Sequence, residues 1–262
     1  MPLFKLKKVW EYCSYNVPFF IFILVLIFIL NTVGDFTEEY MSSDYIAFLL
    51  NGIVSVVLLG YGMLITRDRI NHGHRLPKII VNDVFVLGIK SLFVYIALFL
   101  IQFLILNITS QTFDIPMFDL EDLLMNFEDT VHMFAVNEAF HSLTFIIVGG
   151  LAFYITTFFV EISLAMLADT KSLISAFNVV SLSKKIRVIG LKNYILECTS
   201  IILVIIILSY LQHITIPVFW LDQIWETVLG FLIFATQYLG IGSLYADIKD
   251  NELELNASRY SP

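Results

Sequence analysis

Basic residues gather where a long apolar stretch ends, in the segment GYGMLITRDRINHGHRLP at residues 60–77. Cations in such a position can bind anionic lipid headgroups, because each gains about 1 kcal/mol near an anionic membrane surface. The candidate headgroup-facing residues are Arg67, Arg69, His72, His74, Arg75 and Lys78. Gly73 and Pro77 favour a turn in this segment. The segment is therefore either an elbow that anchors a bent connection at the membrane or a dedicated headgroup or phosphate site.

A second group of candidates consists of charged residues inside apolar stretches, namely Lys90, Glu161 and Glu197. A charge inside hydrocarbon is costly unless it is paired or hydrated. At about 1.5 Å per residue, the three lie in one layer roughly 5–11 Å below the predicted cytoplasmic surface. An ion pair of Lys90 with either carboxylate, snorkelling to the interface, and a proton or cation relay are the alternatives. An uncharged polar residue in such a stretch, such as Gln102, is expected to bond between helices.

Motifs for catalysis or metal binding are scarce. Residues 138–141 have the Glu-x-x-His spacing of di-iron bundles, but such sites need two of these motifs and only one is present. His72 and His74, two residues apart, are weak ligand candidates. The sequence contains no Gly-rich phosphate loop, no G-x-S-x-G elbow and no H-E-x-x-H motif. We therefore expect no catalytic residue, metal or cofactor, and a protein that is not an enzyme.

The composition places these candidates in a membrane protein. The chain is 58% hydrophobic and 15% charged, whereas soluble domains are about 25% charged. About 20 apolar residues span a bilayer core, and six such runs occur, at 17–34, 45–65, 84–107, 141–168, 194–216 and 225–246. The runs are continuous rather than alternating, which predicts helices and not the strands of a membrane barrel. No cleavage site follows the first run, so we expect it to be retained.

All 15 Lys and Arg residues fall on one side of these six runs. They lie in the N-terminal segment, residues 66–83 and 169–193 and the tail 247–262, with Lys90 just inside the third run. The positive-inside rule makes this side cytoplasmic, with both termini facing in. The outer connections are acidic, which fits a solvated outer face or, alternatively, a vestibule that collects cations.

The sequence therefore predicts an all-α, polytopic transmembrane helical bundle that forms a single membrane domain over residues 1–262. It has six spans, cytoplasmic interfacial elbow helices and one outer amphipathic helix. The outer helix is predicted within the loop 108–140, because apolar residues recur there every three or four positions from 117 onward. A surface-lying elbow helix is predicted over 169–187, where apolar residues adjoin lysines and an arginine.

Short internal similarities indicate a repeat. VLGIKS at residues 86–91 resembles VIGLKN at 188–193, and each lies at the start of an odd-numbered span. Three related helical hairpins with the same orientation would follow, and parallel repeats of this kind occur in transporters.

Four segments resemble a known family. They are GYGMLITRDRINHGHRLP, GIKSLFVYI, AMLADTKSLISAFNVV and IGLKNYIL. They look like the membrane-protein family called domain of unknown function 4013, which is common in archaea and also found in bacteria, and the resemblance runs from about residue 45 to 246. It implies a multi-pass integral membrane protein and no assigned activity.

We expect a non-enzymatic component of the cell membrane that acts as a scaffold, a lipid-interacting factor or a partner subunit. Its expected partners are the bilayer and anionic lipid headgroups, and not nucleic acid. One alternative is a transporter or channel that uses the layer of Lys90, Glu161 and Glu197. Another is an enzyme acting on headgroups near Arg67, His72 and His74.

Overall fold

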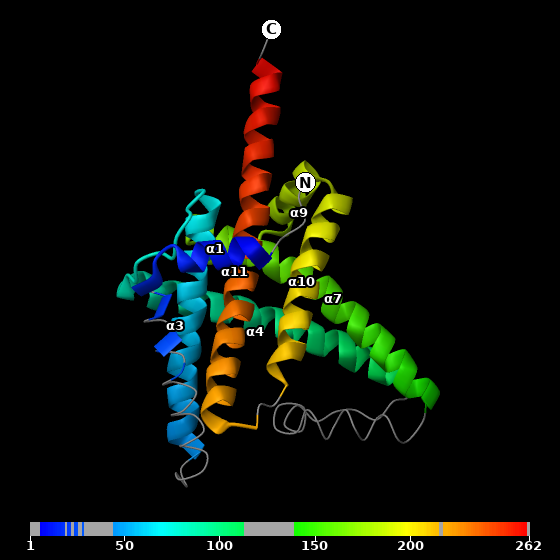
Figure 1. Ribbon diagram of the computed structural model, residues 1–262. Coiled ribbons are helices and arrows are strands. Elements are labelled where there is room, and N and C mark those ends of the chain that lie inside the picture. The colour runs from blue at the N-terminus through cyan, green and yellow to red at the C-terminus, as the bar shows by residue number, and fades with distance from the viewer. Residues whose placement is uncertain are drawn as a thin grey trace. The chain divides into compact units, whose positions relative to one another are not determined.

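The computed structural model of the protein describes residues 6–18, 20–21, 24–25, 28, 44–112, 139–214 and 217–260. The elements in this part are all α-helices, and no strand occurs among these residues (Figure 1). In chain order they are α1 (Leu6–Ser14), α3 (Asp44–Ile70), α4 (Val81–Thr112), α7 (Ala139–Thr170), α8 (Leu173–Ala176), α9 (Val179–Ile189), α10 (Leu191–Gln212) and α11 (Phe219–Tyr260). The predicted all-α class is confirmed for the described residues.

Four helices are long and apolar enough to cross a membrane. The segments are Val81–Thr109 of α4, Ile147–Thr170 of α7, Leu191–Gln212 of α10 and Leu221–Glu254 of α11. Large apolar side chains are exposed along them, such as Leu104, Phe153 and Ile207. Exposed apolar side chains suit a lipid environment. A helix also suits it, because its backbone groups form hydrogen bonds with one another and hydrocarbon offers none.

These four segments correspond to the third to sixth predicted spans. The second predicted span, 45–65, is helical within α3, but α3 is not one of the four helices. Most of the first, 17–34, lies outside the described residues, and so does nearly all of the outer helix predicted at 117–140. The structure therefore supports four of the six predicted spans.

The two predicted elbows differ in structure. Residues 71–80 contain no helix, whereas the second elbow contains α8 and α9 in place of one helix over 169–187. The break falls at Phe177 and Asn178, and the Asn178 side chain accepts a hydrogen bond from the Ser181 N–H at 3.0 Å. Asn178 is thus the N-cap of a separate helix, α9. The interfacial position of these helices stays a prediction.

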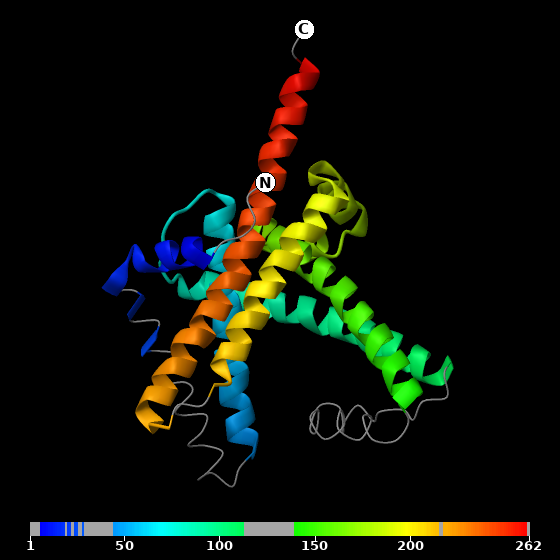
Figure 2. The same cartoon turned by 45° about the vertical axis from the view of Figure 1, so that its right-hand side comes forward.

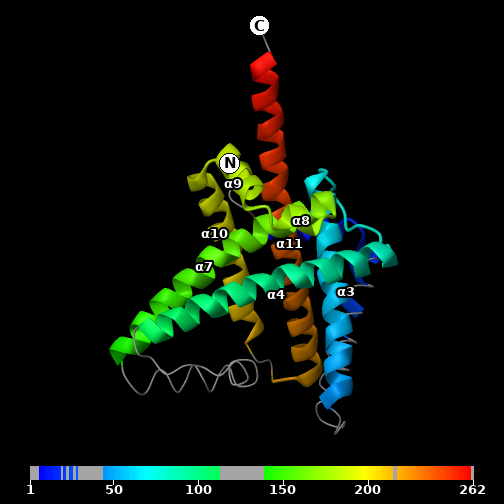
Figure 3. The same cartoon turned by 180° about the vertical axis from the view of Figure 1, so that it is seen from behind.

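The chain divides into two compact units, one made of residues 1–92 and 161–262 and the other of residues 93–160. In the second unit, α4 and α7 lie side by side (Figure 3). The side-chain amide of Gln102 donates to the Thr156 hydroxyl at 2.6 Å. Gln102 therefore bonds between helices, as its place in an apolar stretch predicts.

The first unit is built around α11. This helix packs against α3, α10, α9 and α1, and Figure 2 shows α10 alongside it. The Thr66 hydroxyl of α3 donates to the Tyr238 carbonyl at 3.0 Å, and Gly240 lies against Ile201 of α10. In hydrocarbon such close packing, rather than removal from water, holds helices together.

Helices α3 and α4 approach each other closely at two glycines. A Cβ atom on Gly60 would lie 1.9 Å from the carbonyl oxygen of Val84, and one on Gly88 would lie 2.0 Å from that of Val56. Backbone atoms cannot move aside as a side chain can, so both positions require glycine. This crossing sets the spacing of α3 and α4, which the elbow connects.

Candidate functional site

Helix α3 ends in a Schellman motif that starts the elbow. His72 has a φ of 58°, the left-handed conformation that this motif needs just beyond the helix. The Gly73 N–H donates to the Asp68 carbonyl at 2.8 Å, and the His72 N–H donates to the Arg69 carbonyl at 3.0 Å. These bonds satisfy carbonyl groups at the end of the helix and turn the chain. The motif thereby fixes where Arg69 and the elbow lie.

A hydrogen bond joins the short helix α1 to the end of α3. Tyr12 is buried, and its hydroxyl donates to Asp68 Oδ2 at 2.7 Å. Burial and the nearby Asp68 carboxylate raise the pKa of Tyr12 well above its ordinary value, so the hydroxyl keeps its proton. Val9 and Cys13 are fully buried, and burial raises the pKa of Cys13 to about 12. The three- and four-residue spacing of Val9, Tyr12 and Cys13 is the sequence signal for α1.

Two hydrogen bonds hold the Arg69 side chain. Its Nε donates to Ser243 Oγ at 3.0 Å, and Nη1 donates to the Gly73 carbonyl at 3.3 Å. Helix α11 comes close to α3 at this level, because a Cβ on Gly242 would lie 2.8 Å from the Arg69 Cβ. The guanidinium is therefore fixed in direction while other N–H groups of its fork stay unbonded among the described residues.

Arg67 and His72 are engaged with other parts of the protein. Arg67 lies 3.8 Å from an oxygen of Asp83, and the Lys171 ammonium donates to the same carboxylate at 2.7 Å. His72 Nε2 lies 3.3 Å from Asp250 of α11. These two residues connect α3 to its neighbouring helices.

The other three predicted headgroup-facing residues are exposed. His74, Arg75 and Lys78 make no hydrogen bond or ion pair with any residue that the structure describes. The six predicted headgroup-facing residues thus fall into two groups. Three bind other parts of the protein, and the polar groups of the other three are available to bind a ligand.

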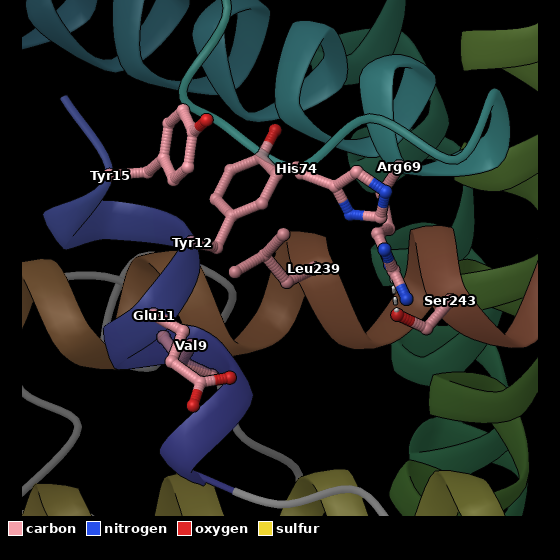
Figure 4. A pocket seen from close by; sticks show the side chains of 8 residues that line it. All are labelled: Val9, Glu11, Tyr12, Tyr15, Arg69, His74, Leu239 and Ser243. Atoms are coloured by element: carbon pink, nitrogen blue, oxygen red, sulfur yellow. Dashed lines mark hydrogen bonds between the residues drawn. The ribbon is translucent and has the colours of Figure 1, made fainter.

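A cleft of about 330 Å³ lies where α1, α3, the elbow and α11 meet. Its lining residues are Val9, Glu11, Tyr12, Tyr15, Arg69, His74, Leu239 and Ser243. Figure 4 shows the two tyrosines at one end, Arg69 with Ser243 at the other, and the His74 ring between them. The cleft brings together two of the six predicted headgroup-facing residues, Arg69 and His74, whereas Arg75 and Lys78 do not line it.

The three hydroxyl-bearing residues of the cleft, Tyr12, Tyr15 and Ser243, are absent from the sequence-based candidates. The hydrogen bond from Tyr12 reaches a residue 56 positions away, and the one from Arg69 reaches a residue 174 positions away. Tyrosine and serine are ordinary residues in a helix. Only the fold, and no local motif, brings them to the elbow.

The three charged residues inside apolar stretches lie in three helices, α4, α7 and α10. Lys90 Nζ donates to the Lys171 carbonyl at 2.7 Å and forms no ion pair with Glu161 or Glu197, which was one of the three alternatives. Both glutamates are buried. One oxygen of Glu161, Oε2, has no hydrogen-bond partner among the described residues.

Ion pairs join the end of α7 and the second elbow to α11. Lys249 donates to Asp169 at 2.9 Å, and Lys185 pairs with Glu252 while its ammonium lies 5.5 Å from the centre of the Tyr245 ring. These cations, which the sequence places at the membrane surface, bind acidic residues of the same unit.

No metal centre is evident among the described residues, which hold no group of three or more His, Cys, Asp or Glu placed to bind an ion. The glutamate of the Glu-x-x-His spacing, Glu138, lies outside those residues. His72 and His74 point to no shared ligand, since His72 faces Asp250 and His74 lines the cleft.

The long apolar helices indicate an integral membrane protein of the all-helical class. Within that class the chain belongs to the family described as "Protein of unknown function (DUF4013)", which it matches over residues 45–218. The match confirms the family resemblance of the elbow and of the segments around Lys90 and Lys171. No curated protein and no solved structure matches the chain.

Proposed function

We propose that the protein is a non-enzymatic, multi-pass component of the cell membrane that binds anionic lipid headgroups with its basic elbow, residues 71–80. The elbow and both termini face the cytoplasm, because all Lys and Arg residues lie on that side of the predicted spans. One observation carries the proposal. Arg75 and Lys78 have no partner among the described residues, and the apolar residues 79–81 beside them are exposed.

Cations next to exposed apolar side chains suit a membrane interface. The apolar groups enter the acyl boundary while each cation near the headgroups gains about 1 kcal/mol. The second elbow supports this reading, since Ile174, Val179 and Val180 are exposed close to the exposed Lys184. Among scaffold, partner-subunit and lipid-interacting roles, these features favour the last.

The test is to purify the full chain in mild detergent and to identify the lipids that remain bound. Anionic lipids should be enriched over their share of the source membrane. The double variant Arg75→Gln/Lys78→Gln should lose about half or more of that enrichment, because both unpaired cations are gone.

The matched control exchanges the two cations, as Arg75→Lys/Lys78→Arg, and keeps the charge. It should retain the enrichment. If the wild-type protein carries lipids in the same proportions as the source membrane, the proposal is wrong.

A second candidate function, a transporter or channel, is favoured by Glu161. Its buried carboxyl group within the apolar helix α7 has an oxygen without a hydrogen-bond partner among the described residues. Buried ionisable residues in membrane helices often mark the path of an ion or a proton. Reconstituted liposomes would then show a flux of ions or protons that Glu161→Gln abolishes, and a flux that this variant leaves unchanged would exclude a carboxylate relay.

A further inference from the structure

We infer that the cleft between α1, α3, the elbow and α11 binds a phosphate group, carried on a lipid headgroup or free in solution. The inference rests on the proposed function and narrows it to one site and one chemical group. Its volume of about 330 Å³ falls at the lower end of the range of small-molecule sites, about 300–1,000 Å³.

Arg69 is the group that selects an anion. Its hydrogen bonds to Ser243 and to the Gly73 carbonyl fix the plane of the guanidinium at one end of the cleft. A guanidinium held in this way presents a fork of donors whose geometry matches the oxygens of phosphate. Little side-chain freedom remains to be lost when a ligand binds.

Further donors surround the same space from other elements. The His74 ring comes from the elbow, and Tyr15 stands on the α1 side with a side chain that is 72% exposed. Neither makes a hydrogen bond to another described residue. The Ser243 hydroxyl, which accepts from Arg69, still has its own proton to donate. Donors on several sides suit a tetrahedral group with many acceptor positions.

The acidic residues nearby do not cancel this preference. Glu11 lines the cleft, but its carboxylate points away from Arg69 and His74 (Figure 4), and it lies 3.5 Å from the Lys7 ammonium. Asp68 accepts the hydrogen bond from Tyr12. The end of the cleft near Arg69 therefore favours a negative ligand.

Binding can be measured by native mass spectrometry of the full-length protein in a neutral detergent. The probes are phosphatidic acid and diacylglycerol with the same acyl chains, which differ only in the phosphate. We expect phosphatidic acid to bind at least about tenfold more tightly, as charge-assisted hydrogen bonds to phosphate are lost with diacylglycerol.

Two variants locate the site. Arg69→Gln and His74→Ala should each reduce the preference for phosphatidic acid by about fivefold or more. The matched control Lys192→Gln removes an exposed cation of α10 that lines neither the cleft nor the elbow, and it should change the preference by less than about twofold. Because His74 makes no hydrogen bond to the described residues, His74→Ala keeps the test decisive even if Arg69→Gln fails to fold.

Inorganic phosphate distinguishes the two sources of the group. Competition with phosphatidic acid that depends on Arg69 assigns a free phosphate to the cleft, and its absence assigns the lipid headgroup. The inference is overturned if neither phosphate probe is preferred, or if Arg69→Gln and His74→Ala leave the preference intact. In that case anionic lipids lost only in the Arg75 and Lys78 double variant would still support the proposed function.

Discussion

Tyr12 shows, at the scale of single residues, how the cleft is held together. Its hydroxyl is the donor that joins α1 to the carboxylate of Asp68, where α3 ends. Asp68 also takes part in the Schellman motif through its carbonyl, which accepts from Gly73. One aspartate therefore fixes both the helix that walls the cleft and the turn that places His74.

Replacing Tyr12 should separate α1 from α3. Tyr12→Phe keeps the buried ring but removes the donor, so we expect the free energy of unfolding to fall by about 1–3 kcal/mol. Thermal unfolding of the purified protein in detergent measures this. Tyr15→Phe, at a side chain that is 72% exposed, is the control and should be neutral. Equal stability of the two variants would show that the Tyr12 hydroxyl does not support α1.

Cys13 offers a test by chemical labelling. Burial raises the pKa of its thiol from 9.0 to about 12. At a pH below about 9, the fraction of Cys13 that is reactive thiolate is therefore about a thousandfold smaller than for an ordinary cysteine. In a Cys198→Ala protein we expect Cys13 to resist maleimide near neutral pH and to react faster as the pH rises toward about 12. After unfolding in detergent it should label at once. Rapid labelling of the folded protein at neutral pH would contradict the burial of α1.

At the scale of elements, the contact between α3 and α4 depends on two positions without side chains. Gly60 and Gly88 each face a backbone carbonyl of the opposite helix. The elbow connects these two helices, so their spacing decides how the elbow is folded. A change in the spacing of α3 and α4 should therefore change the positions of Arg69 and His74.

Gly60→Ala should force α3 and α4 apart. The new methyl group would overlap the Val84 carbonyl, and we expect a loss of about 1–3 kcal/mol or more in stability. Gly52→Ala lies in the same helix, and a Cβ there meets nothing within 4 Å. It should be neutral or stabilise by up to about 1 kcal/mol. Unfolding curves that place both variants together would argue against the close crossing.

The elements could be predicted from the sequence much better than their contacts. The runs at 84–107, 141–168, 194–216 and 225–246 reappear as spanning helices because hydrocarbon requires about 20 apolar residues in an internally bonded form. The break between α8 and α9 differs from the single helix predicted over 169–187, because it involves the side chain of Asn178 as an N-cap. A surface pattern alone does not reveal such a bond.

The cleft could be predicted only in part. Arg69 and His74 stand out in the sequence because they lie in a basic segment after an apolar run. Nothing local indicates that Arg69 bonds to Ser243, or that Lys90 bonds to a carbonyl rather than to Glu161. These contacts join residues that are far apart in the chain, and they follow from how α11 packs.

At the scale of the whole molecule, the one-sided distribution of Lys and Arg predicts the orientation in the membrane. A fluorescent protein fused after residue 262 should fluoresce, and alkaline phosphatase at the same position should be inactive, because that end is predicted to be cytoplasmic. An active phosphatase fusion would reverse the orientation and would place the elbow outside the cell.

Helix α11 has a mechanical consequence. It runs without interruption from Phe219 to Tyr260, and it touches the cleft at Ser243. The rod continues for about 25 Å past that point, at 1.5 Å per residue. Ion pairs through Lys249, Asp250 and Glu252 bind the first part of this stretch to α7, His72 and α9, so a shift of α11 at the cleft would also move those elements.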